Sequence, residues 1–230
     1  YLVYFHLLPP HGPYKTRIEY FNQFADDDFQ ARNKPENFLS DNLTTQDLAL
    51  PRRRYDEFIL YVDAEIKRLF QQLKANGQLD QTWVILTSDH GEMFERGLRG
   101  HQYAAGYEPL NRIPLVIFPP GQAERVDIHS PTSAVDIIPT LLAVSGKPIP
   151  ESLEGQVLPP FNRAYPEDRP IYVIDAKYSP PREAYQTASF MLRQGSYKLI
   201  HHIGDKQEYT LLNGQSLTAV SYTHLTLPTN

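Results

Sequence analysis

The feature that most constrains this chain is the run of residues 84–92, VILTSDHGE, in which an apolar segment ends abruptly in polar residues. A short apolar run with polar flanks is typical of a buried strand. Open α/β sheets bind ligands beyond the carboxyl ends of their strands, so Asp89 and His90 are expected at a site. Both are metal-ligand types, and Gly91 lets the backbone approach closely, so the run predicts a bound divalent cation. The alternative from these residues alone is a strand followed by an ordinary polar loop.

Two further histidines follow the same pattern. His11 lies in residues 7–14, LLPPHGPY, where prolines restrict the backbone on both sides. His101 lies in the string RGHQ, shortly before the apolar residues 113–118. Core strands are predicted at residues 1–5 and 113–118 as well as before Asp89, which places three histidine-bearing loops beside three strands. The histidines without motif support, predicted to be structural or exposed, are His6, His129, His201 and His202.

Three strings together resemble the sulfatases of the alkaline-phosphatase superfamily. They are residues 10–14 (PHGPY), residues 87–92 (TSDHGE), and residues 135–142 (VDIIPTLL) with Gly146 and Pro148. Their order and spacing match over most of the chain. The resemblance implies an α/β fold with a mixed, mostly parallel sheet flanked by helices, followed by a small α+β subdomain with a short antiparallel sheet.

The resemblance also implies a role for four residues. Asp89 and His90 would be two ligands of the catalytic metal. His11 would contact the sulfate ester and protonate the leaving oxygen, and His101 occupies the position of a lysine or histidine that binds the transferred group. Hydrolysis of a sulfate monoester develops charge on oxygen atoms, which a fixed cation and imidazole donors stabilise. Glu92 belongs to the motif but receives no chemical role from it.

The implied function is metal-dependent hydrolysis of sulfuric esters, acting on a sulfate-ester small molecule or a sulfated glycan. Calcium is the first metal expected, with manganese or zinc as alternatives that an imidazole ligand favours. One alternative function is a phosphoryl-group hydrolase or transferase of the same superfamily, such as a phosphonate monoesterase, phosphodiesterase or phosphoglycerol transferase. The other is a noncatalytic truncated domain whose histidines only pack or weakly bind metal.

The sequence departs from the family at the nucleophile. The family motif Cys/Ser-x-Pro-x-Arg is absent, and the chain contains no cysteine. The amino-terminal aspartates that complete the family's metal site are also absent, and two ligands alone hold a metal weakly. We therefore expect an incomplete chain, the carboxy-terminal part of a longer enzyme, that is inactive by itself.

Three parts are predicted along the chain. Residues 1–158 would form the second part of the catalytic α/β domain, and residues 159–218 the small carboxy-terminal subdomain. Residues 219–230 resemble a translated sequencing-adaptor tail rather than a native segment, and are expected to be disordered or loosely placed. The alternative for this tail is an ordinary variable carboxy terminus.

Composition excludes several other classes. A hydrophobic content of 41% with 21% charged residues is ordinary for a globular protein. The net charge of −5 argues against nucleic-acid binding. No apolar run is long enough to span a membrane. The absence of cysteine excludes disulfides but says little about location, and a periplasmic or extracellular parent would be consistent with the family.

Periodicity predicts the remaining elements. A helix is expected to open at Pro51 and to stop at Asn76-Gly77, with Arg52 to Arg54 near its positive end as a solvated turn or a contact for a substrate anion. Residues 15–50 are expected to be an irregular insertion over the sheet. Residues 130–136 are expected to lead into a second helix that runs through Val144. Its predicted core residues are Leu141, Leu142 and Val144. The short strands predicted in the subdomain are residues 171–174, 188–192 and 198–200, with a closing strand at 209–213.

Overall fold

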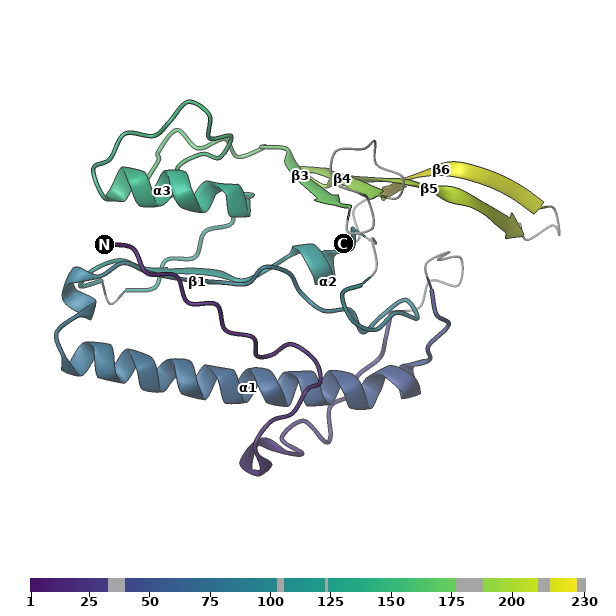
Figure 1. Cartoon of the computed structure of the whole chain (residues 1–230), viewed down its shortest axis with the longest axis horizontal. Coiled ribbons are helices and arrows are strands. Elements are labelled where there is room, and N and C mark those ends of the chain that lie inside the picture. The colour runs from purple at the N-terminus through teal and green to yellow at the C-terminus, as the bar shows by residue number, and fades with distance from the viewer. Residues whose placement is uncertain (33–39, 103–105, 123, 177–187, 211–215, 227–230) are drawn as a thin grey trace. The chain divides into compact units, whose positions relative to one another are not determined.

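The structure of the chain is a computed structural model (Figure 1) that describes residues 1–32, 40–102, 106–122, 124–176, 188–210 and 216–226, and side chains through residue 203. The chain divides into two compact units. The first comprises Tyr1–Tyr103 and Tyr107–Ala123, and the second comprises Ala104–Gly106 and Glu124–Asn230. The predicted functional division at residue 158 stays a prediction.

The longest element of the first unit is helix α1, Thr45–Ala75. It begins at a capping box in which Thr44 Oγ1 accepts the Asp47 N–H (3.3 Å) and Asp47 Oδ2 accepts the Thr44 N–H (2.8 Å). The predicted start at Pro51 is wrong, because this box already satisfies backbone donors at the helix start and Pro51 lies inside the helix. The predicted end is confirmed, since Asn76 is the C-cap and Gly77 adopts a φ of +66°.

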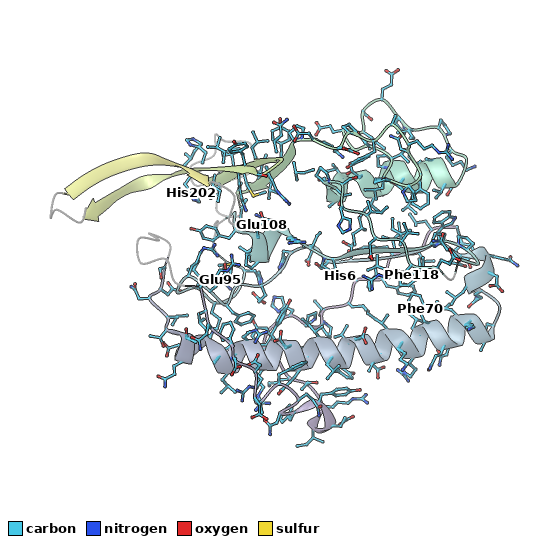
Figure 2. The ribbon with its side chains drawn as sticks, turned by 180° about the vertical axis from the view of Figure 1, so that it is seen from behind. His6, Phe70, Glu95, Glu108, Phe118 and His202 are labelled. Atoms are coloured by element: carbon cyan, nitrogen blue, oxygen red, sulfur yellow. The ribbon has the colours of Figure 1, made fainter. Side chains whose placement is uncertain are left out.

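Helix α1 runs alongside a two-stranded sheet (Figure 1). Strand β1, Val84–Thr87, pairs antiparallel with β2, Leu115–Phe118. The rings of Phe70 on α1 and Phe118 on β2 meet edge to face, with centroids 4.7 Å apart (Figure 2). Both strands were predicted, although β2 starts later than residue 113.

The sheets differ from the sequence-based expectation in strand direction. Every strand pair among the described residues is antiparallel, whereas a mostly parallel sheet was expected. Among the described residues of the connection from β1 to β2, the one helix is the single turn α2, Glu108–Asn111, which is too short to cross back over the sheet. The chain therefore returns in the opposite direction.

The strand predicted at residues 1–5 is also wrong. Residues 1–8 are extended but pair with no other described strand, and the side chains of Tyr4 and Phe5 are 81% and 75% exposed. An apolar sequence alone does not make a strand, because its backbone groups need a neighbour.

The described part of the insertion packs on α1 rather than over the sheet. It includes the short helix η1, Ile18–Tyr20. Arg53 Nη2 donates to the Ala25 carbonyl (2.9 Å), and Arg52 pairs with Asp27. The buried Glu57 carboxylate accepts the Asn22 N–H (2.7 Å). The basic run on α1 therefore binds the insertion, and neither a substrate contact nor a solvated turn describes it.

The second unit begins with the short helix η3, Ala134–Asp136, which continues into helix α3, Ile137–Val144. Its buried face is formed by Asp136, Pro139 and Thr140, whereas the predicted core residues Leu141, Leu142 and Val144 are only half-buried. Asp136 can be buried because Arg169 Nη1 donates to both of its carboxylate oxygens, at 2.7 and 2.6 Å.

The rest of this unit is an antiparallel sheet of four strands in the order β3-β4-β5-β6. The strands are β3 (Ile171–Asp175), β4 (Ala188–Gln194), β5 (Tyr197–Thr210) and β6 (Ser216–Thr226). The three short strands predicted here are confirmed. Of the predicted closing strand, residues 209 and 210 lie in β5 and residues 211–213 fall outside the described residues.

Strand β6 contradicts the expected loose placement of the chain end. Residues 219–226 pair with β5, because the outer edge of β5 presents backbone donors and acceptors that any extended segment can satisfy. Residues 227–230 lie outside the described residues. None of the described helices is long and apolar enough to cross a membrane.

We expect the substitution Thr44→Ala to destabilise α1 by about 1 kcal/mol, because it removes the capping box. Urea unfolding followed by circular dichroism measures the change. A hydrogen bond from the Thr44 side chain holds the pKa of Asp47 below its usual value. The contribution of the ionised Asp47 carboxylate should therefore be present above the ordinary aspartate pKa of about 3.9 and disappear as the pH falls through the lower folded value. The exposed Gln46→Ala is the matched control, and an equal loss in both variants would contradict the assignment.

Candidate active site

The centre of the candidate site is the loop that follows β1. Asp89 and His90 lie just past the end of this strand, as predicted, with side chains 70% and 36% exposed. The His90 N–H donates to Asp89 Oδ1 (3.0 Å), and His90 Nδ1 lies 2.9 Å from the Gly91 carbonyl oxygen. Because a carbonyl only accepts, Nδ1 carries the proton and His90 Nε2 is the nitrogen that can bind a cation.

Gly91 fixes this loop against helix α2. Its N–H donates to the Leu110 carbonyl (2.9 Å), and a Cβ at this position would lie 1.9 Å from the Pro109 carbonyl oxygen. The predicted close approach of the backbone is confirmed, but the partner is protein backbone. Glycine is needed here because there is no room for a Cβ atom.

Three histidines from separate segments meet beside this loop. The His101 ring stacks on His90, with centroids 4.2 Å apart and planes inclined by 30°. His11 meets His101 edge to face at 5.1 Å. The exposed His11 places Nδ1 2.7 Å from the Gly12 carbonyl oxygen, which assigns a proton to that nitrogen as well. The structure thus brings together all four site residues predicted from the sequence.

Glu92 was not assigned a role from the sequence, although it stands in the same string as Asp89. Its side chain is 4% exposed, and its Oε1 lies 3.0 Å from His101 Nδ1. The same carboxylate acts on Tyr14 of the PHGPY string, whose pKa is raised first by burial and then by the negative charge of Glu92. The position of Glu92 inside the motif was the signal that could have identified it.

His6 is a second residue that the sequence did not place at the site. The partial burial of Asp89 would raise the pKa of its carboxyl, but the neighbouring imidazoles of His90 and His6 and the His90 N–H favour the carboxylate, so the pKa lies below its usual value. His6, labelled in Figure 2, is exposed, as predicted. In the second unit, His129 is exposed and His202 is buried and hydrogen-bonded to Ser189, which confirms their interpretation as exposed and structural.

The donor atoms fit part of a metal site. Asp89 Oδ2 and His90 Nε2 lie 3.7 Å apart, a separation that allows both to bind one cation at about 2.0–2.6 Å. In the described part of the chain, no group of three or more histidine, cysteine, aspartate or glutamate residues is arranged to hold a metal. The described residues therefore offer two ligands, a carboxylate and an imidazole.

Comparisons with known proteins identify the family of the chain. The family model described as Sulfatase matches residues 1–147, more than half of the chain, so the chain belongs to the sulfatase family. The uncharacterized sulfatase YidJ of Escherichia coli is 32% identical over 160 residues, which cover 64% of this chain and 32% of that protein. The chain thus spans about a third of the length of this relative.

Two solved structures also resemble the chain. One, a complex with its substrate D-glucosamine-2-N,6-O-disulfate, is 28% identical with a TM-score of 0.54, covering 70% of this chain and 33% of that chain. The other comes from work on glycosaminoglycan metabolism by Bacteroides thetaiotaomicron. It is 23% identical with a TM-score of 0.64, covering 95% of this chain and 45% of that chain, and this likeness concerns the fold.

We expect Gly91→Ala to destabilise the loop by about 2 kcal/mol or more, because the new Cβ would overlap the Pro109 carbonyl and must displace backbone. Native-state hydrogen exchange at the residue 91 N–H measures the loss of protection, about thirtyfold for that energy. Gly121→Ala is the control, since nothing lies within 4 Å of a Cβ there and only its φ of +67° is strained. Equal effects of the two substitutions on their own loops would contradict the role of close packing.

Proposed function

We propose that this protein takes part in the hydrolysis of sulfuric esters, with its active site at Asp89, His90, His101 and His11. The observation that carries the proposal is the convergence of three histidines beside an exposed carboxylate, in a chain of the sulfatase family. Three separate segments must fold correctly for these rings to meet. A noncatalytic domain would have no need for this arrangement.

The residues of the chain suit the charge that develops in this reaction. In this proposal His11 and His101 bind the sulfate group, and when the His11 ring carries a second proton, its Nε2–H can protonate the leaving oxygen. His101 donates to a sulfuryl oxygen and thereby stabilises the transferred group. Asp89 and His90 Nε2 hold the divalent cation, which supplies electrostatic stabilisation of the ester oxygens when bound.

Calcium is the metal we propose first, because the Asp89 carboxylate is exposed and oxygen ligands suit a hard cation. Manganese and zinc are the alternatives, since His90 presents an imidazole nitrogen. The proposed substrate is a sulfated glycan or a smaller sulfate ester. The solved structure in complex with D-glucosamine-2-N,6-O-disulfate supports a sulfated sugar for a related protein.

We further propose that the nucleophile and the remaining metal ligands come from a segment outside these 230 residues. The sequence contains no cysteine, and the chain matches about a third of the E. coli relative. The same segment would supply the parallel strands of a complete α/β sheet. Residues 1–158 would belong to that catalytic domain, residues 159–218 to a small subdomain, and residues 219–230 to a tail of foreign origin.

The 230-residue chain alone should release no sulfate from 4-nitrophenyl sulfate, because it has no family nucleophile. In a longer product of the same gene that carries a Cys/Ser-x-Pro-x-Arg motif, His11→Ala should lower the rate about a hundredfold or more. His129→Ala, at an exposed histidine of the second unit, is the matched control. Steady turnover by the 230-residue chain that His11→Ala abolishes would overturn the proposal for the nucleophile.

The same assay separates the sulfatase from its phosphoryl-transfer relatives. A faster reaction with 4-nitrophenyl phenylphosphonate than with 4-nitrophenyl sulfate would favour a phosphonate monoesterase. A preference for the sulfate ester supports the proposed function.

A further inference from the structure

We infer that Glu92 is a positioning residue that fixes the proton of His101 on Nδ1 and holds the imidazole ring in place against His90. The importance of this ring orientation for catalysis rests on the proposed function. The hydrogen bond between Glu92 and His101 does not depend on that function. No role for Glu92 follows from the motif alone.

The Glu92 carboxylate is buried. The Glu92 side chain is 4% exposed, and burying an ionised carboxylate is costly unless hydrogen-bond donors surround it. An ionised carboxylate only accepts hydrogen bonds. At 3.0 Å from Oε1, His101 Nδ1 must therefore carry a proton.

The bond to Glu92 also decides which nitrogen of the His101 ring faces a substrate. A hydrogen bond made by one ring nitrogen of a histidine decides which of the two nitrogens carries the proton. With Nδ1–H directed at Glu92, the imidazole addresses a substrate through Nε2. Nε2 donates to a sulfuryl oxygen when the ring is fully protonated, which is the contact proposed for His101.

Glu92 also lies between segments that are distant in the sequence. The Glu92 carboxylate lies close enough to Tyr14 for its charge to raise the pKa of that phenol, after the larger effect of burial, and the Tyr14 ring packs edge to face on Tyr55 of α1 (5.4 Å) and on Phe94 (5.9 Å). The carboxylate thus links the segment that carries His11 to the segment that carries His101. A ring held by one strong acceptor and stacked on His90 has little freedom to turn.

The test is nuclear magnetic resonance of the 230-residue chain labelled with ¹⁵N-histidine, at a pH well above the ordinary histidine pKa of about 6.5, where each neutral ring shows its tautomer. In the wild-type chain, His101 should show the pattern of a single Nδ1–H tautomer. In Glu92→Gln, the amide can donate as well as accept, so His101 Nδ1 no longer has to carry the proton. The single-tautomer pattern should then be lost. In Glu92→Leu the acceptor is absent, and the same loss is expected.

The matched control is Glu57→Gln, which removes another buried carboxylate of the first unit that hydrogen-bonds Asn22 and Arg54. This variant should leave the His101 tautomer unchanged, so a general loss of stability cannot imitate the effect. An Nε2–H tautomer in the wild-type chain would overturn the inference, as would an unchanged tautomer in both Glu92 variants. The readout needs no turnover, so a failure of the proposed sulfatase activity would be seen separately.

Discussion

The buried carboxylate of Glu92 is the constraint on which the arrangement of the histidines depends. A charge with a side chain only 4% exposed must find a donor, and His101 supplies one from nine residues further along the chain. Once His101 is held there, His90 stacks on one side and His11 packs against its edge. One buried group therefore organises residues that are far apart in the sequence.

The same physical principle recurs elsewhere in the chain. Glu57 is fully buried in the first unit and paired with Arg54, where it holds the insertion on α1. Asp136 is fully buried in the second unit and paired with Arg169, which ties α3 to the segment before β3. Breaking such a pair leaves an uncompensated buried charge, so each pair makes its local geometry specific.

The sequence predicted best where the information is local. The Asp89 and His90 loop follows its apolar strand, and the helix end at Gly77 depends on one glycine. Prediction from the sequence failed where the local structure depends on a contact with another segment. Residues 1–5 have no described strand to pair with, the capping box overrides Pro51 as a helix start, and Asp136 can be buried beside α3 because Arg169 pairs with it. The roles of Glu92 and His6 were missed for the same reason, because their partners lie on other segments.

Asp89, His90, His101 and His11 are proposed to form one site. Addition of Mn²⁺ to the ¹⁵N-histidine-labelled chain tests it directly, because a paramagnetic ion broadens the signals of nearby nuclei. The His90 ring should broaden first, then His101 and His11, and Ca²⁺ or Asp89→Asn should reverse the effect. Broadening that spares His90, or that Asp89→Asn leaves unchanged, would contradict the account.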